Sequence, residues 1–280
     1  ISSFIYAVGV FSILTKVLPW LHKKFIKGKA PELNEKNYQK DVVYLYQFNG
    51  TPTVPSMSPF CVKVEGFLRL HNIKFERRYT MSIRGRNGLL PMVELNGEIL
   101  SDSQMIIRRL TQIYKIKPYK DEQTAAMAHA IDRLLDNHTC NLLTYQKTHN
   151  PTPIITSIVK SMVPAFVLPI AGSIGSCVMT KMIHKRVAAS IGKFTDAEYN
   201  ELLKNDLVQL QTILGKNKFL MGDEPTAVDC TALGQLGVSI YAFPEARNYI
   251  FDLLESSELR LLKEYVDRTR DTIFGNEFHQ

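Results

Sequence analysis

The sequence lacks the cysteine spacing of a disulfide-stapled or metal-bound fold. Its four cysteines lie far apart along 280 residues, and this spacing fits neither a disulfide framework nor a zinc ligand set. They form no cadmium site either, so no metal is expected. We expect buried or reduced thiols in a protein that faces the cytosol, at Cys61, Cys140, Cys177 and Cys230.

Other absences exclude whole classes of protein. The chain has no repeat of about 20–50 residues, no low-complexity tract and no collagen period, which excludes solenoids and fibres. Apolar residues make up 45% and charged residues 22% of the chain, which argues against a long disordered chain and against a polytopic membrane protein. On a prior of about 150 residues per domain, the length suggests two domains.

The positive charge is concentrated near one end of the chain. The formal net charge is +7, and four lysines fall within seven residues directly after an apolar stretch, namely Lys23, Lys24, Lys27 and Lys29. A surface built for nucleic acid would spread its charge over a folded face and interleave it with aromatic residues. We therefore expect no nucleic-acid partner.

Residues 1–40 are predicted to be a hydrophobic membrane-anchor segment followed by a basic and polar linker. The stretch from Phe4 to Leu21 is apolar, but Lys16 and Pro19 interrupt it, and a full bilayer span needs about 20 apolar residues. Three interpretations stay open: a signal-anchor helix with Trp20 at the interface, an interfacial amphipathic segment, and a cleaved secretory signal.

If the segment spans, the lysines that follow it place the body of the protein on the cytosolic side. The chain begins with Ile1 rather than Met, so we expect further residues to precede it.

Residues 41–117 are predicted to form strand, helix, strand, loop, hairpin and helix. The run 42–48 is β-branched and aromatic and ends at Asn49-Gly50, which is typical of a strand and turn. A helix over 59–71 and a strand over 73–79 follow. Asn96-Gly97 between two short apolar runs predicts a hairpin. A last helix begins near Asp102 and should bury Ile106, Ile107, Leu110 and Ile113. This is the thioredoxin-type order, with the loop 81–88 in place of one helix.

Residues 118–280 are predicted to be helical. Asp121 begins a long helix whose apolar face includes Met127 and His138, and we expect that histidine to be satisfied within the core. Capping boxes at 195–198 and 226–229 begin two more helices. Residues 161–180 carry no charge. We expect either buried helices or a membrane-facing patch there, with Lys181, Lys185 and Arg186 at lipid headgroups. The prolines and glycines of the run argue against a simple span.

Several motifs in this order resemble a known family. Ser58-Pro59-Phe60-Cys61 stands at the first helix, Pro91 opens the hairpin, and Ser101-Asp102-Ser103 begins the last helix. The segments SPFCVKVEGFLRLHNIKFE, GLLPMVELNGEILSDS and IGKFTDAEYNELLKNDLVQLQTILGKNKFLMGDEPTAVDCTALGQL resemble glutathione S-transferase-like proteins. They are most similar to the failed axon connections branch, with its cadmium-responsive relatives and, more distantly, the metaxins. The resemblance covers residues 41–272.

This resemblance implies an α/β N-terminal thioredoxin-like domain followed by an all-α, glutathione S-transferase C-terminal-like helical domain. In a redox-active thioredoxin the attacking thiolate takes the first position of a C-x-x-C at the helix N-terminus. Here that position is Ser58, so dithiol exchange within this motif is excluded. The hydroxyl can bind a glutathione thiolate, as in the serine-type transferases, or it can only cap the helix. Cys61 is expected to pack rather than react.

The resemblance also implies which residues hold glutathione. Leu90, before a cis Pro91, would pair its backbone with the cysteinyl part, and Asp102 and Ser103 would hold the γ-glutamyl end. A helix N-cap is the alternative role for the last two.

Three further residues are weaker candidates. Arg84 and Arg86 either contact the glutathione carboxylates or lie on a solvated loop, and the solvated loop is the preferred interpretation. Tyr46 is a second candidate hydroxyl, for which core packing is the default.

Two functions follow from the sequence. The first is a membrane-associated glutathione transferase or peroxidase-like enzyme that uses a Ser-type site on hydrophobic electrophiles, in a stress or xenobiotic and metal response. The alternative is a non-catalytic, metaxin-like adaptor that keeps the fold without turnover. The resemblance implies a homodimer, and the lysosomal and mitochondrial outer membranes are both open. For a cytosolic body we expect the sequons at Asn49 and Asn137 to stay unmodified.

Overall fold

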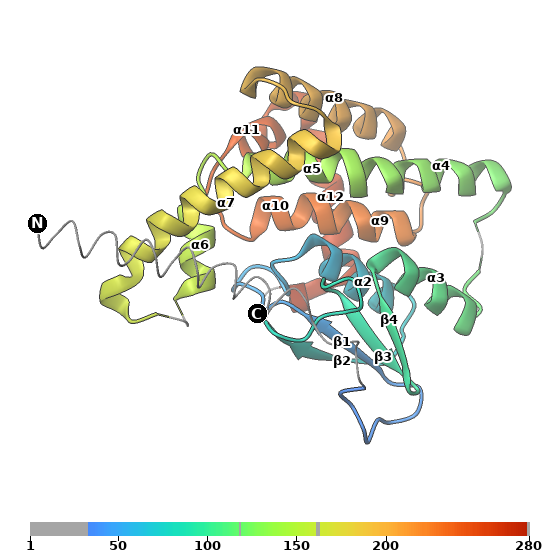
Figure 1. Ribbon diagram of the computed structural model, residues 1–280. Helices are drawn as coiled ribbons and strands as arrows, with labels where there is room; N and C mark the ends of the chain where they lie inside the picture. Colours follow the sequence, from blue (N-terminus) through green and yellow to red (C-terminus); the bar gives the residue numbers. More distant parts are fainter. Residues whose placement is uncertain (1–32, 118, 161–162, 279–280) are drawn as a thin grey trace, which may run out of the picture. The chain divides into compact units, whose positions relative to one another are not determined.

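The computed structural model describes residues 33–117, 119–160 and 163–278 (Figure 1). The predicted anchor at 4–21 lies outside the described residues. The chain divides into two compact units, which we call the sheet unit (33–48 and 73–115) and the helical unit (49–72 and 116–278). Unlike the expected division near residue 117, residues 49–72 group with the helices. The reason is that helix α2 (Pro59–Leu70) packs on α9 (Ala227–Ala232) and on the π-helical turn η3 (Leu233–Gly237).

The sheet unit is a four-stranded mixed sheet with one helix. Its strands are β1 (Val43–Gln47), β2 (Phe75–Tyr79), β3 (Met92–Leu95) and β4 (Glu98–Ser101), in the order β2-β1-β3-β4. Strand β1 runs parallel to β2 and antiparallel to β3. The predicted thioredoxin-like order is therefore confirmed. The turn between β3 and β4 holds Asn96 and Gly97 at positive φ, as a two-residue hairpin of type I′ requires.

Helix α3 (Ser103–Ile113) contacts β3 and β4. It buries Ile106 and Leu110 completely, as predicted. The prediction that Ile113 is buried is wrong, since 37% of it is exposed. Ile113 is the last residue of the helix, and Ile106 and Leu110 already fill the stripe that faces the core.

A buried carboxylate joins the linker to this sheet. Glu94 on β3 is 1% exposed, and its Oε1 accepts hydrogen bonds from the backbone N–H and the side-chain amide of Asn34, at 2.8 and 2.7 Å. Its Oε2 accepts from the Glu35 N–H at 2.8 Å and from the Tyr46 hydroxyl at 3.3 Å. Because a buried charge needs donors, these bonds fix residues 34–35 on the sheet.

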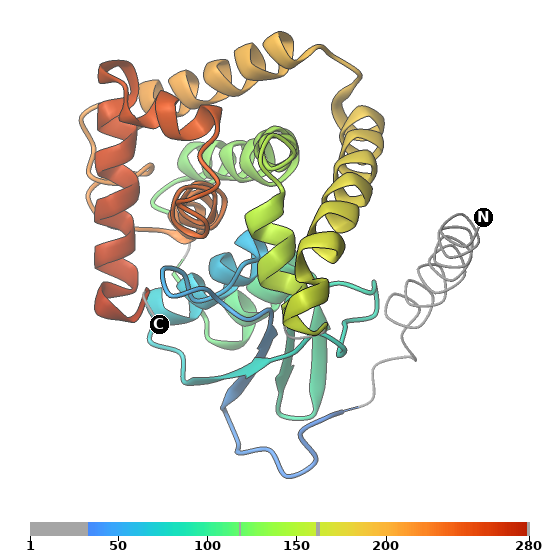
Figure 2. The same ribbon diagram turned by 90° about the vertical axis from the view of Figure 1, so that its left-hand side faces the viewer.

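The helical unit contains the remaining helices (Figure 2). Their core is formed where α2 packs on α9, η3 and α12. The approach at Gly234 is so close that an added Cβ would lie 2.4 Å from the carbonyl oxygen of Pro59. The elements in chain order after α2 are α4 (Glu122–Arg133), η1 (Leu134–Thr139), α5 (Cys140–Gln146), α6 (Thr152–Val159), η2 (Ala165–Val167), α7 (Leu168–Ile191), α8 (Asp196–Leu214), α9, η3, α10 (Val238–Tyr241), α11 (Tyr249–Glu255), η4 (Ser257–Leu259), α12 (Arg260–Ile273) and η5 (Gly275–Phe278).

Both predicted capping boxes are confirmed. Thr195 and Glu198 begin α8, and Thr226 and Asp229 begin α9. Asp229 is fully buried and also accepts from the Leu220 N–H at 2.9 Å and the Tyr265 hydroxyl at 2.7 Å. Burial raises the pKa of Asp229 above its ordinary value despite these donors. The second box therefore stabilises the interior of the fold.

The long predicted helix after Asp121 is interrupted by the π-helical turn η1. His138 lies in that turn, partly exposed, with its Nδ1 2.8 Å from Oδ2 of Asp206. The prediction of a satisfied histidine holds, although it is not fully enclosed. Met127, predicted to lie on the buried face, is exposed instead, because it is on the outer side of α4.

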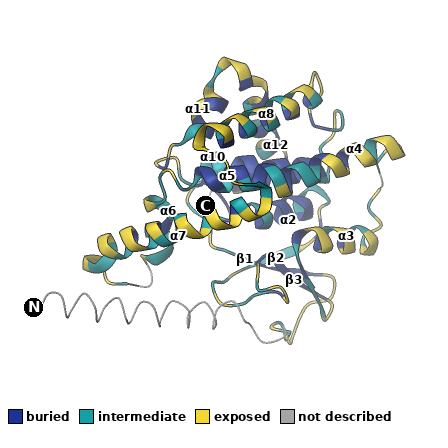
Figure 3. Ribbon diagram, turned by 45° about the horizontal axis from the view of Figure 1, so that its top comes forward, coloured by how far each residue is buried: buried dark blue, intermediate teal, exposed yellow. Residues whose placement is uncertain are grey.

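Helices α6 and α7 lie side by side as a hairpin (Figure 2). Of the two interpretations for the uncharged run, burial is wrong: Phe166 is 83% and Ile170 64% exposed. Among the described residues, 165–191 is the one helical stretch long and apolar enough to cross a membrane, judged by length and composition. Figure 3 shows α7 mainly in the colours of exposed and intermediate residues.

Candidate glutathione site and neighbouring grooves

The start of α2 carries the residue that the sequence singles out. Ser58 is the N-cap, with extended backbone angles of φ −98° and ψ 121°, and Pro59 follows at the first helical position. The carbonyl oxygen of Ser58 accepts hydrogen bonds from the N–H groups of Cys61 and Val62, each at 3.1 Å. Its hydroxyl makes no capping hydrogen bond, although a serine at this position normally caps. The interpretation that Ser58 serves only as a cap therefore loses its geometric support.

The loop before Ser58 is fixed from within. The Ser58 N–H donates to the hydroxyl of Ser56 at 3.3 Å, and the Met57 N–H donates to the carbonyl of Asn49 at 3.1 Å. Ser58 itself is only 9% exposed. Its position at the helix tip is thus defined by the loop backbone and by Pro59, and not by its own side chain.

An ion cluster holds α2 from its middle. The ammonium of Lys63, 3% exposed, lies 2.7 Å from Oδ1 of Asp132 and 2.5 Å from Oδ2 of Asp136. Asp136 also accepts from the amide of Gln235 at 3.1 Å, and Asp132 from the hydroxyl of Thr231 at 2.6 Å. Asp136 and Gln235 stand in the π-helical turns η1 and η3. These contacts link α2 to two other helices of the unit.

The cluster changes the acidity of Asp132. Burial by itself would raise the pKa of this carboxyl, but Lys63, Thr231 and Arg133 outweigh burial and lower the pKa below its ordinary value. The cluster was not predicted from the sequence. Lys63 is one of three charged residues in α2, with Glu65 and Arg69, and no local pattern distinguishes it.

The sheet unit brings four of the predicted residues to one end of the hairpin. Met92 pairs with Ser101 across β3 and β4, so Leu90 and Pro91 before β3 adjoin Asp102 and Ser103 after β4. The Leu90–Pro91 peptide bond is cis, as the resemblance implies. Leu90 and Ser103 are buried.

Asp102 combines a cap with an unusual backbone. Its Oδ1 accepts from the N–H groups of Gln104 at 3.0 Å and Met105 at 3.3 Å, which caps α3. Its φ is +78°, a value that costs energy in residues with a Cβ and that clusters at functional sites. Asp102 is therefore both a cap and a candidate binding residue.

The loop 81–89 covers the end of β4. The Arg86 N–H donates to the hydroxyl of Ser101 at 3.2 Å. A Cβ on Gly85 would lie 2.5 Å from that hydroxyl oxygen, so this crossing requires glycine. Ser101 was named in the sequence only as part of the Ser101-Asp102-Ser103 motif, and its contact with the loop at Gly85 was not predicted.

The weaker candidates take structural roles. The Arg84 guanidinium lies 5.0 Å from the ring centroid of Phe48, while Arg86 is exposed. Tyr46 is buried, as its default interpretation predicts, and burial together with Glu94 raises its pKa far above the ordinary value. Its hydroxyl donates to Glu94 at 3.3 Å, so this donor is already used within the sheet unit. Cys61 is fully buried, as predicted for a packing residue.

All four cysteines are described, and none forms a disulfide; Cys177 is exposed, and the other three are buried.

A groove in the helical unit lies along the loop that leads to Ser58. Its volume is about 530 Å³, and five of its twelve lining residues carry hydroxyl groups. The Thr51-Pro52-Thr53 segment, which sequence analysis noted only as a loop, supplies part of the lining. The lining residues are Thr51, Pro52, Thr53, Thr152, Pro153, Thr156, Ser157, Lys160, Ala242, Phe243, Pro244 and Glu245.

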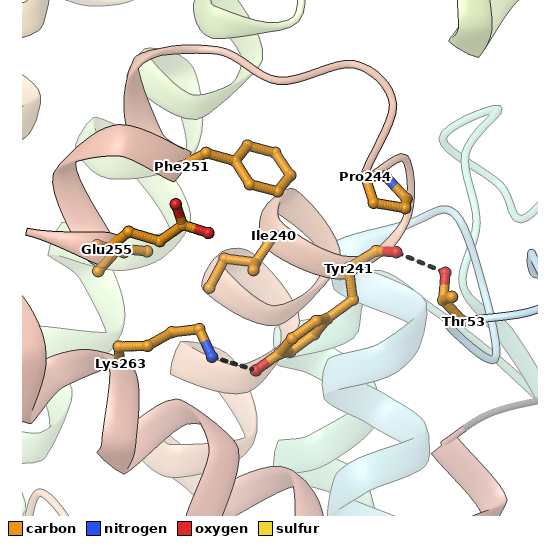
Figure 4. A pocket seen from close by; sticks show the side chains of 8 residues that line it. Thr53, Ile240, Tyr241, Pro244, Phe251, Glu255 and Lys263 are labelled. Atoms are coloured by element: carbon orange, nitrogen blue, oxygen red, sulfur yellow. Dashed lines mark hydrogen bonds between the residues drawn. The ribbon is translucent and has the colours of Figure 1, made fainter.

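A second cavity of about 280 Å³ opens beside it (Figure 4). The Thr53 hydroxyl donates to the carbonyl of Tyr241, and the Lys263 ammonium lies 3.4 Å from the Tyr241 hydroxyl and 2.6 Å from Asp267. Ile240, Phe251 and Leu254 form the apolar part of the wall. Of the two charged lining residues, Lys263 is paired with Asp267 and Glu255 with Arg247 at 2.7 Å, so the cavity presents a mainly apolar surface with both charges paired.

Comparison with known proteins decides the family. Residues 59–152 match the glutathione S-transferase N-terminal domain, and residues 203–269 match the glutathione S-transferase C-terminal domain. Failed axon connections from Drosophila melanogaster is 31% identical over 266 residues, which cover 89% of this chain and 63% of that protein. The chain belongs to the glutathione S-transferase-like superfamily. Within it, the chain falls on the failed axon connections branch, and it spans 63% of the length of the Drosophila protein.

Solved structures agree on the fold of this superfamily member. Glutathione transferase GSTFuA3 from Phanerochaete chrysosporium superposes with a TM-score of 0.52 at 15% identity, covering 82% of this chain and 98% of that one. A glutathione S-transferase from Methylobacterium radiotolerans, crystallised with glutathione sulfonate, gives 0.51 at 17% identity, covering 82% and 90%. At these identities the similarity establishes the fold alone.

Proposed function

We propose that this chain is a membrane-associated glutathione transferase-like protein with a serine-type site. The observation that supports the proposal most directly is the Ser58 hydroxyl at the N-cap of α2, which makes no capping hydrogen bond. A hydroxyl donor at the positive end of a helix is suited to an anion. The anion we propose is the thiolate of glutathione.

The reaction is the transfer of this sulfur to an electrophile. The thiol loses its proton to solvent water, and the thiolate sulfur donates an electron pair to an electrophilic carbon. A C–S bond forms as the bond to a leaving group such as halide breaks, and the halide departs with that electron pair. A free thiol has a pKa of about 8.5. Hydrogen bonding from Ser58 and the dipole of α2 would lower that pKa and raise the thiolate fraction at neutral pH.

Residues of the sheet unit would hold the peptide part of glutathione. In this proposal the Leu90 backbone pairs with the cysteinyl part, Pro91 keeps that backbone open, and Asp102 with Ser103 binds the γ-glutamyl end. The cap at Asp102 and its φ of +78° support such a role, since they hold the carboxylate in one orientation. A glutathione S-transferase crystallised with glutathione sulfonate shares this fold.

The electrophile is proposed to be hydrophobic, as in defence against xenobiotic compounds or against metal stress. The apolar wall of Ile240, Phe251 and Leu254 supports an apolar co-substrate. The hydroxyls at Thr51 and Thr53 would favour one with an additional polar group.

One experiment tests binding and turnover separately. The full chain, solubilised in mild detergent, is applied to immobilised glutathione, and conjugation of an activated chloronitroarene is followed by absorbance. Wild type, Ser58→Ala and Thr195→Ala are compared, since Thr195 is a cap hydroxyl on a different helix, α8. Retention with turnover that requires Ser58 but not Thr195 is expected. Absence of retention by wild type contradicts the glutathione proposal.

A non-catalytic adaptor is the second candidate function. Exposed apolar residues on η2 and α7, chief among them Phe166 and Ile170, favour a surface that docks to another molecule. Retention of wild type on glutathione without any turnover would support this adaptor over the enzyme.

The N-terminal segment is proposed to attach the protein to a membrane, with its body in the cytosol. The sequon at Asn49 tests the orientation, because Asn49 is exposed and would be glycosylated in a lumen. At Asn137, the hydroxyl of the sequon's Thr139 is buried and bonds Asp206 at 2.6 Å, so this site is a poor reporter. We expect no glycosidase-sensitive mass shift in cells. A shift that Asn49→Gln removes would contradict the cytosolic orientation.

A further inference from the structure

The hairpin of α6 and α7 shows the reverse of the usual burial pattern. The buried residues of α7 are Gly172, Ser176 and Val187. The large apolar side chains Phe166 and Ile170 are exposed instead. A helix of a soluble protein normally turns its large apolar side chains inward. Small residues between packed helices and large apolar residues outside are typical of helices that face lipid.

The small residues of α7 face α6. An added Cβ on Gly172 would lie 3.2 Å from the hydroxyl of Thr156, and one on Gly175 would lie 2.7 Å from Ile155. The hydroxyls of Thr152 and Ser176 are 3.4 Å apart. This pairing is antiparallel, so the two helices form one closely packed unit. Its outer side is the apolar one.

The charge of the segment points to an anionic surface. From residue 137 to residue 195 the sequence contains no Asp or Glu. The same stretch carries six basic residues, Lys147, Lys160, Lys181, Lys185, Arg186 and Lys193. The exposed side runs from Phe166 on η2 through Ile170 to Lys181 and Lys185 on α7. Residues 153–202 lie between the two ranges that match the transferase domains.

We infer that the α6–α7 hairpin docks on an anionic lipid bilayer, with Phe166, Ile170 and Ile174 entering the acyl region of one leaflet. Lys181, Lys185 and Arg186 then lie at the phosphate level, where each cation contributes to binding. This contact is separate from the proposed anchor in residues 1–40 and from glutathione binding.

The hairpin lies obliquely in one leaflet and does not cross the bilayer. Ile170 and Lys181 are eleven residues apart, about 16 Å along the helix, which is close to half the hydrocarbon thickness of about 30 Å. The pairing of Thr156 with Gly172 brings Lys160 to the level of Leu168. A perpendicular span would place that ammonium inside the hydrocarbon, whereas in an oblique hairpin Lys160 reaches the headgroups.

A fluorescent reporter at position 166 tests the inference in the full chain. Trp20 is the chain's one tryptophan, so the pair Trp20→Phe and Phe166→Trp moves the only reporter to the hairpin. Vesicles contain equal parts phosphatidylcholine and phosphatidylserine with brominated acyl chains, which quench a tryptophan that touches them. Wild type reports separately on the N-terminal segment through Trp20.

We expect quenching at position 166 with these vesicles. Adding Ile170→Ser and Ile174→Ser should raise the lipid concentration for half-maximal quenching more than tenfold, on the order expected for losing two buried aliphatic side chains. Adding Lys181→Gln and Lys185→Gln should raise it about tenfold or more. The matched controls, Leu261→Ser on α12 and Lys216→Gln with Lys218→Gln, should change it less than about twofold, since these residues are exposed elsewhere.

Two results would overturn the inference. In the first, Trp20 in wild type is quenched while position 166 is not, so that the N-terminal segment alone meets lipid. In the second, position 166 stays unquenched and the chain associates with concentration in a way that Phe166→Ser with Ile170→Ser abolishes, so that a second copy covers the surface. Unchanged circular dichroism and thermal midpoints show that each variant is folded.

Discussion

The two helices that begin at the predicted glutathione residues are secured in opposite ways. Helix α3 is secured at its first turn, where Asp102 accepts two backbone hydrogen bonds. Helix α2 has no side-chain cap at Ser58 and is held from its middle, through Lys63 and the carboxylates of Asp132 and Asp136. The difference suggests a division of labour. A helix held from its interior leaves its N-terminal tip free for a ligand, whereas at α3 one carboxylate both caps the helix and is proposed to bind the ligand.

The largest effect should come from the interior support of α2. Lys63→Met removes the ammonium from the buried Asp136 and the half-buried Asp132 and leaves them Arg133 as their cation, which costs about 3 kcal/mol of unfolding free energy. Chemical denaturation measures this loss. Lys204→Met is the control, because Lys204 pairs with Glu258 at 2.8 Å on the surface, and it should change stability little. A Lys63→Met protein as stable as Lys204→Met would contradict the role of the cluster.

Ser58→Ala should separate activity from stability. We expect a loss of about 100-fold in conjugation rate, the scale of one lost hydrogen bond to a reacting anion. Stability should change by less than about 0.5 kcal/mol, since no capping bond is removed. Thr195→Ala should do the reverse, losing about 1 kcal/mol of stability with unchanged turnover. If Ser58→Ala destabilises as Thr195→Ala does, the hydroxyl is a cap in solution.

Asp102→Ala should show what the tip of α3 contributes. The cap is lost and the positive φ remains, so we expect a loss of about 1–2 kcal/mol, read from the urea midpoint, together with weaker retention on glutathione. Asp102→Asn keeps an acceptor at the cap and tolerates this φ. Asp102→Asn should therefore be as stable as wild type. If it is still retained less on immobilised glutathione than wild type, the difference is due to the lost carboxylate charge. Equal retention by all three proteins would remove Asp102 from the site.

The smallest expected effect is the pH dependence of the unfolding free energy. Its sign follows from the pKa of Asp132. Because the pKa of Asp132 is lower in the folded protein than in the unfolded chain, this residue stabilises the fold above its unfolded pKa of about 3.9. That stabilisation is lost as the pH falls through the folded pKa. In Lys63→Met the contributions of Lys63 are lost while those of Thr231 and Arg133 remain, so the folded pKa of Asp132 rises and its contribution to stability shrinks. Urea midpoints of both proteins across the acid range measure this, and parallel pH profiles would count against it.

Local sequence patterns predicted much of the fold because its signals lie within a few residues. The hairpin turn at Asn96-Gly97 and the two capping boxes need only neighbouring residues, and the strand β1 needs only its own apolar run. The cis bond before Pro91 was expected from the family resemblance. These elements depend on backbone preferences that short segments already express.

What could not be predicted depends on partners far away in the sequence. The carboxylates that bind Lys63 are 69 and 73 residues away along the chain, and no residue near Lys63 in the sequence predicts this contact. The uncharged run of α7 has the composition of a buried helix, and only its packing on α6 shows which side chains stay uncovered. Likewise, a serine at a helix start predicts a cap, and only coordinates show that this one is not used.

Glu94 determines the residue at which an N-terminal membrane tether would join the folded sheet unit. Four donors converge on that one carboxylate, three of them from residues 34 and 35. The length of a tether is therefore the number of residues before Asn34, and the residues between Asn34 and β1 do not add to it. Lengthening the stretch between Asn34 and Val43 should leave the reach of a membrane tether unchanged, while insertions just ahead of residue 33 should extend it.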